Sequence, residues 1–266
     1  MTAGGIRRHF QTFFGCRAFR DTGFEFFSPP EVNLVLPTSR YPAENVRGVR
    51  KPLGCSINTK VKFMFFLVSG ATASGKSTVA KNLPSQLENL VCHDYDERKV
   101  TDEYTRCQQL EEWVQLALNH QQEGRDFLLT SHSPFGELLA CPSARNLAGI
   151  SACLLDCSDP NRIQRMRKRG FDPRWPPTQD VLNWASWHRM HAWDPQWEQR
   201  VIIGNGPFEH SYDCWIHWKQ NDKRWQVRVI DTTATDVELM LDRVATWVKS
   251  EREKVPLLTL DTKWWK

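Results

Sequence analysis

The hydrophobic positions of the chain form short apolar runs that alternate with segments carrying helical signals. The apolar runs have strand length and cover residues 63–68, 90–93, 127–130, 150–156 and 224–230. Apolar spacing or capping residues indicate helices over 76–83, 102–122, 136–147, 159–170, 179–193 and 235–248. Strands that alternate with helices predict an α/β fold of three layers, in which helices cover both faces of a mainly parallel five-stranded sheet.

Two segments depart from this alternation of strands and helices. In residues 170–200, three prolines precede a helix rich in tryptophan and a fourth follows it; the tryptophans of this stretch are Trp175, Trp184, Trp187, Trp193 and Trp197. Farther on, residues 212–219 and 224–230 both alternate and flank a Gln-Asn-Asp-Lys turn. This pattern predicts a C-terminal β-hairpin arm whose second strand joins the sheet.

A glycine-rich loop follows the first apolar run and opens a helix. Residues 70–77 read GATASGKS and fit the phosphate-loop pattern G-x-x-x-x-G-K-[ST] without a mismatch, in the required strand–loop–helix context. The glycines let backbone N–H groups point at a phosphate, Lys76 is expected to reach the β- and γ-phosphates, and the Ser77 hydroxyl is expected to ligate Mg²⁺. The predicted nucleotide-binding residues are Gly70, Ala71, Thr72, Ala73, Ser74, Gly75, Lys76, Ser77 and Thr78. The motif thus predicts binding of a nucleoside triphosphate, without stating what is done with it.

The net charge of +4 is unevenly distributed over the 266 residues. Residues 1–63 carry ten Lys/Arg and four Asp/Glu, net +6, which leaves 25 basic and 27 acidic residues, net −2, for the remainder. The basic surplus belongs to the front segment, so nucleic acid is not an expected partner of the rest. Since no apolar run approaches the roughly 20 residues that span a bilayer, a membrane role is not expected either.

The front segment has three possible interpretations. Its first twenty residues contain four arginines and no acidic residue, which is the composition of a mitochondrial or plastid transit peptide. Its prolines are equally typical of a poorly structured extension. Alternatively, Met64 is the true start, because it stands where the first apolar run begins. The eight cysteines form no C-x-x-C pair, which favours reduced thiols and a cytoplasmic location.

Charged and polar residues cluster where predicted strands end, which is the edge at which open α/β sheets bind ligands. Residues 93–97 read HDYDE after the second strand, and the third strand ends in Thr-Ser-His at 130–132. The helix over 159–170 carries several arginines, and Asp-Thr-Thr at 231–233 precedes the last helix.

These motifs, in this order, make residues 64 to about 249 resemble the small P-loop kinases, the shikimate-, gluconate- and nucleoside-kinase-like group of ATP-binding proteins. The resemblance rests on GATASGKST, on HDYDE and on RMRKR at 165–169. It implies that Asp94 and Asp96 face the acceptor hydroxyl and the metal, with Asp94 the first choice for the base. It also implies that Arg165 and Arg169 flank the adenine and the transferring phosphate, whereas a solvated face is the better interpretation for Arg162, Arg167 and Lys168.

The resemblance further implies a lid over 170–200 and a loop past the adenine at Thr232 and Thr233. The tryptophans of the lid are more often packing residues than a stacking wall. His188 and His191 share a helical face, but a zinc site would need His210 or His217 as well, so packing is favoured for them. Residues 1–63 would be an extension and residues 250–266 a charged, partly ordered tail.

One departure concerns the metal. The family pattern places a carboxylate at the end of a strand beside the loop strand, and the third strand here has none. Either Mg²⁺ is held by Ser77, water and the acidic pair, in particular Asp94, or Asp156 has taken this role.

Three functions follow as hypotheses. The first is transfer of the γ-phosphate of ATP to a hydroxyl or phosphate of a small-molecule acceptor, by a monomer or homodimer. The second is a nucleotide-binding or slowly hydrolysing regulatory protein without efficient transfer. The third, which the net charge of −2 disfavours, is a kinase acting on nucleic-acid ends.

Overall fold

The structure is a computed structural model that describes residues 63–98, 103–170, 178–203 and 210–266. The predicted N-terminal extension, apart from Phe63, lies outside the described residues, and so do residues 171–177 of the predicted lid, which include Trp175.

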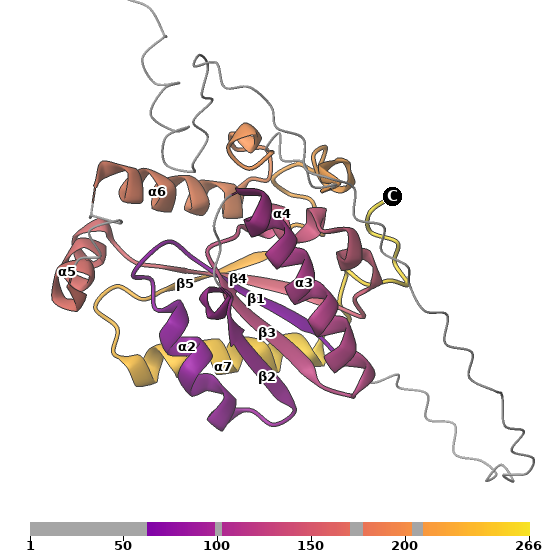
Figure 1. The fold of residues 1–266 in the computed structure, drawn as a ribbon, viewed down its shortest axis with the longest axis horizontal. Helices are drawn as coiled ribbons and strands as arrows, with labels where there is room; N and C mark the ends of the chain where they lie inside the picture. Colours follow the sequence, from indigo (N-terminus) through magenta and orange to yellow (C-terminus); the bar gives the residue numbers. More distant parts are fainter. Residues whose placement is uncertain (1–62, 99–102, 171–177, 204–209) are drawn as a thin grey trace, which may run out of the picture. The chain divides into compact units, whose positions relative to one another are not determined.

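Five parallel strands form one sheet in the order β2-β3-β1-β4-β5 (Figure 1). The strands are β1 (Phe65–Ser69), β2 (Leu90–Asp94), β3 (Asp126–Ser131), β4 (Ile150–Asp156) and β5 (Val227–Asp231). In register, Ser69 lies beside Ser131 and Leu154, Asp94 beside Thr130, and Asp156 beside Asp231. The carboxyl ends of all five strands therefore meet at one edge, and the predicted α/β fold with a parallel five-stranded sheet is confirmed.

Helices cover both faces of the sheet. They are α2 (Lys76–Asn82), α3 (Glu103–Gln122), α4 (Phe135–Ala140), α5 (Asp159–Arg169), α6 (Gln179–Trp193) and α7 (Val237–Glu253). Short 3₁₀ turns stand between them: η1 (Leu83–Gln86), η2 (Tyr95–Glu97), η3 (Pro142–Asn146), η4 (Gln199–Val201) and η5 (Tyr212–Cys214). The helix predicted over 136–147 is divided at Pro142 into α4 and η3.

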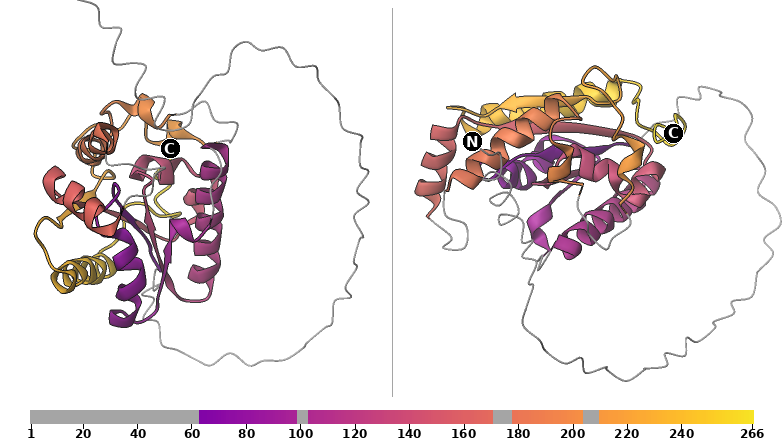
Figure 2. Two further views of the ribbon diagram at one scale, coloured as in Figure 1. Left: turned by 60° about the vertical axis from the view of Figure 1, so that its left-hand side comes forward. Right: turned by 90° about the horizontal axis from the view of Figure 1, so that it is seen from above.

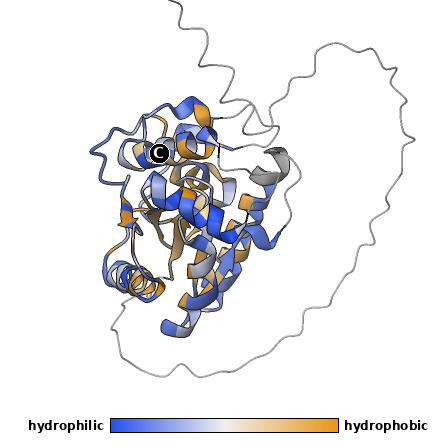
Figure 3. Ribbon diagram, turned by 90° about the vertical axis from the view of Figure 1, so that its left-hand side faces the viewer, coloured by the Kyte–Doolittle hydropathy of each residue, from blue (hydrophilic) through white to orange (hydrophobic). Residues whose placement is uncertain are grey.

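The two faces bury separate hydrophobic clusters because successive strand residues point to opposite sides. Phe65 and Leu67 face α3, α4 and α6, whereas Phe66 and Val68 face α2 and α7. Figure 2 shows α3 and α7 on opposite sides of the sheet, and Figure 3 shows hydrophobic strands surrounded by hydrophilic helix surfaces. None of the described helices is long and apolar enough to cross a membrane.

Two expectations are corrected by the packing. The predicted β-hairpin arm does not form, because its first half holds η5 and turns, and Trp215 and Trp218 are buried at three-residue spacing. Only the second half joins the sheet, as β5 alongside β4.

The predicted C-terminal tail is part of the core. Helix α7 continues to Glu253, and beyond it Leu258 and Trp264 are buried in the cluster on the α3 side. The carbonyl oxygen of Leu258 accepts a hydrogen bond from Ile150 N, at the start of β4.

Helix α6, predicted as a lid, packs on the sheet beside β4 and β5 within the described part of 170–200. Trp184 and Trp187 are buried in the core cluster, which confirms the packing interpretation for these two, while Trp193 and Trp197 are exposed.

Candidate nucleotide-binding site

The glycine-rich loop makes a tight turn between β1 and α2. Gly75 has φ 112°, in the left-handed region, and a Cβ there would lie 2.6 Å from Met240 Sδ. Gly70 is required by close approach, since a Cβ would lie 2.5 Å from both the Leu155 carbonyl oxygen and Ser74 Oγ. The two glycines of the motif are thus the positions at which no side chain fits.

Lys76 stands at the first position of α2, within this loop. Its Nζ donates a hydrogen bond to the Ala71 carbonyl oxygen at 3.1 Å. Burial lowers the pKa of Lys76 to about 8, although the negative charges of Asp96 and Asp94 act in the opposite direction. Thr72 and Ser77 are exposed, and Thr78 is half-buried.

The acidic pair comes to the same edge from β2. Asp94 ends this strand and its Oδ1 accepts a hydrogen bond from Asp96 N at 3.3 Å, within a capping box completed by Glu97. Burial and the charge of Asp94 raise the pKa of Asp96, and Lys76 lowers it. Asp94 therefore caps η2, and both carboxylates also act electrostatically on Lys76, across the end of β3.

Asp156, the alternative metal ligand, ends β4 and is engaged by two arginines. Its Oδ1 accepts a hydrogen bond from Arg162 Nη2 at 2.8 Å, and its Oδ2 accepts one from Arg189 Nε at 2.5 Å. Both oxygens of Asp156 are bonded to guanidinium groups, which compete with Mg²⁺ for this carboxylate. Arg189 connects α6 directly to the sheet edge.

Arg162 was expected on a solvated face, and this is wrong. The residue is fully buried, and its Nη1 donates a hydrogen bond to the Thr72 carbonyl oxygen at 2.6 Å. It is a site residue that sequence reasoning missed. Its spacing of four from Met166, the other buried residue of α5, was the available signal.

Arg165 and Thr232 support the phosphate loop through hydrogen bonds to its carbonyl groups. Arg165 Nη1 donates to the Ala73 carbonyl oxygen at 3.2 Å and to Thr232 Oγ1 at 3.0 Å, and Nη2 also bonds the Thr232 carbonyl oxygen. Thr232 is fully buried, and its Oγ1 lies 3.1 Å from the Ser74 carbonyl oxygen. Thr233 Oγ1 accepts a hydrogen bond from Ser158 N. This arrangement makes Thr232 a support of the loop rather than a surface for the base.

Arg169 lies one turn farther along α5 and is exposed. Its charge acts on Lys76, so it stands near the phosphate loop. Arg167 and Lys168 are exposed as well, which agrees with a solvated face for these two.

The donor set fits Mg²⁺ rather than a transition metal. No group of three or more His, Cys, Asp or Glu able to hold a metal ion occurs among the described residues. Mg²⁺ keeps several waters and needs only one or two protein oxygens beside the phosphates. The exposed Ser77 hydroxyl and the Asp94 carboxylate would be those oxygens.

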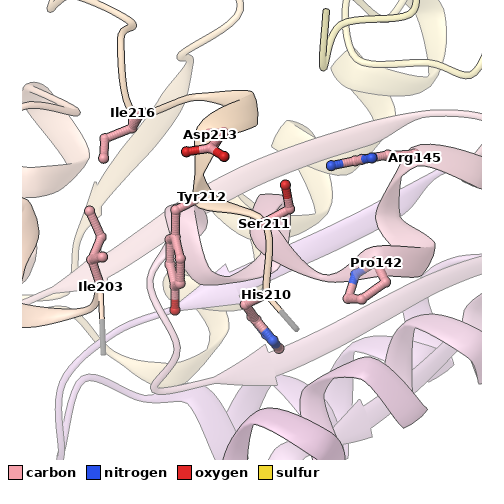
Figure 4. Close-up of a pocket in the computed structure, with 8 residues that line it drawn as sticks. All are labelled: Pro142, Arg145, Ile203, His210, Ser211, Tyr212, Asp213 and Ile216. Atoms are coloured by element: carbon pink, nitrogen blue, oxygen red, sulfur yellow. The ribbon is translucent and has the colours of Figure 1, made fainter. Parts of the chain in front are cut away.

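A hollow of about 540 Å³ lies apart from the residues of the nucleotide site (Figure 4). It is lined by residues of η3, of η5 and of the segments beside them: Pro142, Arg145, Ile203, His210, Ser211, Tyr212, Asp213 and Ile216. None of the nucleotide-site residues contributes to it.

Comparisons with known proteins give distant structural likenesses alone. No protein-family model and no curated protein matches the sequence. An unliganded sugar kinase from a Janibacter species is 15% identical, with a TM-score of 0.45 over 70% of this chain and 95% of that one. A thymidylate kinase from Candida albicans is 12% identical, with a TM-score of 0.45 over 73% of this chain and 94% of that one. At these values the likenesses carry no argument about function, which must come from the site itself.

Proposed function

We propose that this protein transfers the γ-phosphate of Mg-ATP to a small metabolite of the nucleoside, sugar or cyclitol class. The observation that supports this most is the position of Lys76, Asp94 and Asp96 at one edge of the sheet, where burial lowers the pKa of Lys76 and the charges of the two carboxylates oppose this shift. A phosphate-side cation and acceptor-side carboxylates thus share one sheet edge. A site that only holds a nucleotide does not need the two carboxylates.

The residues divide the reaction between them. Lys76 would bind the β- and γ-phosphates, and Arg169 would approach the same charge from α5. The acceptor hydroxyl oxygen forms the new bond to phosphorus as the bond to the ADP oxygen breaks, and Asp94 takes the hydroxyl proton late in this step. Mg²⁺, when bound, supplies neutralisation of the phosphate oxygens. Arg162 and Arg165 hold the loop in shape through Thr72 and Ala73.

The test is a phosphotransfer screen with the full chain, Mg-ATP and a panel of nucleosides, sugars, cyclitols and their monophosphates, read as ADP release. We expect at least one acceptor to raise the rate, and Asp94→Asn to abolish the increase while ATP still binds. Lys76→Ala should lose ATP binding.

A nucleotide-binding regulatory role is the second candidate, because β3 ends without a carboxylate and Asp156 is held by two arginines. It is favoured if ATP binds tightly, depends on Lys76, and no acceptor changes the rate of ADP release. A short oligonucleotide in the same panel examines the nucleic-acid alternative.

A further inference from the structure

His188, on α6, is a buried histidine without a hydrogen-bond partner. His188 is 2% exposed, and neither nitrogen of its ring has a hydrogen-bond partner among the described residues. Leaving a buried polar group unpaired costs about 1–3 kcal/mol. Such a group calls for a specific explanation, and one explanation is a ligand that completes its hydrogen bonds.

The ring lies at the sheet edge that carries the nucleotide site. The next residue, Arg189, reaches Asp156 at the end of β4. Burial keeps the pKa of His188 well below 6.5, and the charges of His191, Lys76, His132 and Arg162 act in the same direction. The imidazole is therefore neutral at physiological pH, and Lys76 and His132 are near enough to affect it.

Aromatic side chains enclose the ring from the α6 side. Trp184 and Trp187 stack on each other at 4.8 Å, and their ring centroids lie 5.4 and 6.2 Å from that of His188. His132, whose charge helps to lower the pKa of His188, follows β3 and meets Tyr95 of η2 edge-on at 4.9 Å. Tyr95 stands between Asp94 and Asp96, so His132 connects the acidic turn to the region of His188.

Three arginines of the described residues near this region are bonded to protein atoms. Arg162 and Arg189 bond Asp156, and Arg165 bonds Thr232 and Ala73. The carboxylates of Asp94 and Asp96 would repel an acceptor that carries a phosphate. A neutral imidazole offers one donor and one acceptor, which matches a hydroxyl group.

We infer that His188 positions the acceptor, and that this acceptor is an uncharged, hydroxyl-bearing metabolite held between α6 and η2. A ring nitrogen of His188 bonds one hydroxyl of the metabolite, and another hydroxyl faces Asp94 and Lys76. This inference rests on the proposed transfer function and narrows its substrate class.

A control for His188 is available on the same helix. The ring nitrogens of His191 are buried as well and have no side-chain hydrogen-bond partner among the described residues, but this ring stacks on Trp187 at 4.7 Å and meets Trp215 and Trp225 edge-on, inside the core. Replacing either histidine with leucine removes a buried imidazole from α6. Only the change at position 188 should affect the acceptor.

The experiment compares the full-length wild type with His188→Leu, His188→Gln and His191→Leu. The probes are matched pairs: thymidine and thymidine monophosphate, glucose and glucose 6-phosphate, and inositol and inositol monophosphate. ADP release gives kcat and KM for each acceptor, and calorimetry gives the Kd for ATP.

We expect an uncharged member of a pair to be the better substrate. His188→Leu should raise its KM at least tenfold with the ATP Kd within twofold of wild type, His188→Gln should recover part of the loss, and His191→Leu should leave KM within twofold.

Three results overturn the inference. If only the phosphorylated members react, the transfer function stands and the assignment of an uncharged acceptor falls. If His188→Leu and His191→Leu have equal effects on KM, His188 is a packing residue. If no pair accelerates ADP release although ATP binds, the proposed transfer function is wrong, and so is the role of His188 that rests on it.

Discussion

Arg162 Nη1 lies 2.6 Å from the carbonyl oxygen of Thr72, and this hydrogen bond joins helix α5 to the phosphate loop. The two residues are 90 positions apart in the chain. The same guanidinium bonds Asp156 Oδ1 at 2.8 Å and the Cys157 carbonyl oxygen at 3.2 Å. A single buried side chain thereby joins the loop, the end of β4 and α5. The shape of the nucleotide site depends on a residue that need not touch the nucleotide.

Arg162→Met should therefore both destabilise the protein and weaken ATP binding. It leaves Asp156 with one arginine and the Thr72 carbonyl without its donor, and breaking a buried ion pair costs about 3–5 kcal/mol. Chemical denaturation and ATP titration measure the two effects. Arg167→Met, on an exposed position of the same helix, is the control and should stay within about 0.5 kcal/mol. Equal effects of the two changes would contradict the structural role.

Gly70→Ala should weaken ATP binding at least tenfold. The new methyl group would lie 2.5 Å from the backbone oxygen of Leu155, which cannot move without shifting β4. Gly170→Ala is the control, because a Cβ there meets no described atom within 4 Å. It costs some backbone strain at φ 84° but should leave the ATP Kd within twofold. An unchanged Kd in Gly70→Ala would show that the loop tolerates the contact.

The phosphate loop and the sheet could be predicted because their signals are local. Strands β1, β3 and β4 are buried on both faces, and buried parallel strands read as continuous apolar runs. The loop is specified within eight residues, where Gly75 supplies a left-handed φ of 112° and Gly70 leaves room for the Ser74 side chain.

The remaining features depend on contacts between distant segments. Arg162 looks like any exposed arginine until α5 is placed against the loop. The false hairpin was predicted because the apolar residues Cys214, Ile216 and Trp218 alternate as in a strand. Burial of Trp215 and Trp218 is instead decided by packing against α4, α6 and the C-terminal segment. Trp264 stands in a segment without periodicity, so nothing in its neighbourhood predicted burial.

Asp94→Asn should separate chemistry from structure. Asparagine keeps an oxygen to accept the hydrogen bond from Asp96 N, so stability should change by less than about 0.5 kcal/mol. It cannot accept the proton of an acceptor hydroxyl, so acceptor-stimulated transfer should fall roughly 10²- to 10⁴-fold. Steady-state assays and ATP titration test this, with Asp242→Asn on the exposed side of α7 as the control. Retention of full transfer would exclude Asp94 as the base.

His191 should make the protein sensitive to mild acid. Burial lowers the pKa of His191 from 6.5 to about 3. Between these values the unfolded chain binds a proton that the folded protein lacks, so the stabilisation is complete above pH 6.5 and is lost as the pH falls toward 3. The loss between pH 7 and pH 5 should be about 2 kcal/mol. Denaturation curves at the two pH values should show this loss reduced in His191→Phe and unchanged in His217→Phe, since His217 is exposed.

Trp264→Ala should show that the last residues belong to the core. Trp264 is 2% exposed, meets Trp218 edge-on at 6.1 Å, and its carbonyl oxygen accepts a hydrogen bond from Arg224 Nη1 at 3.1 Å. Truncating a buried tryptophan to alanine costs about 3–5 kcal/mol. Trp193→Ala, at a residue 59% exposed, should cost about 0.5 kcal/mol or less. The comparison is made by chemical denaturation of the full-length protein. A loss for Trp264→Ala no larger than that for Trp193→Ala would restore the interpretation of residues 250–266 as a tail.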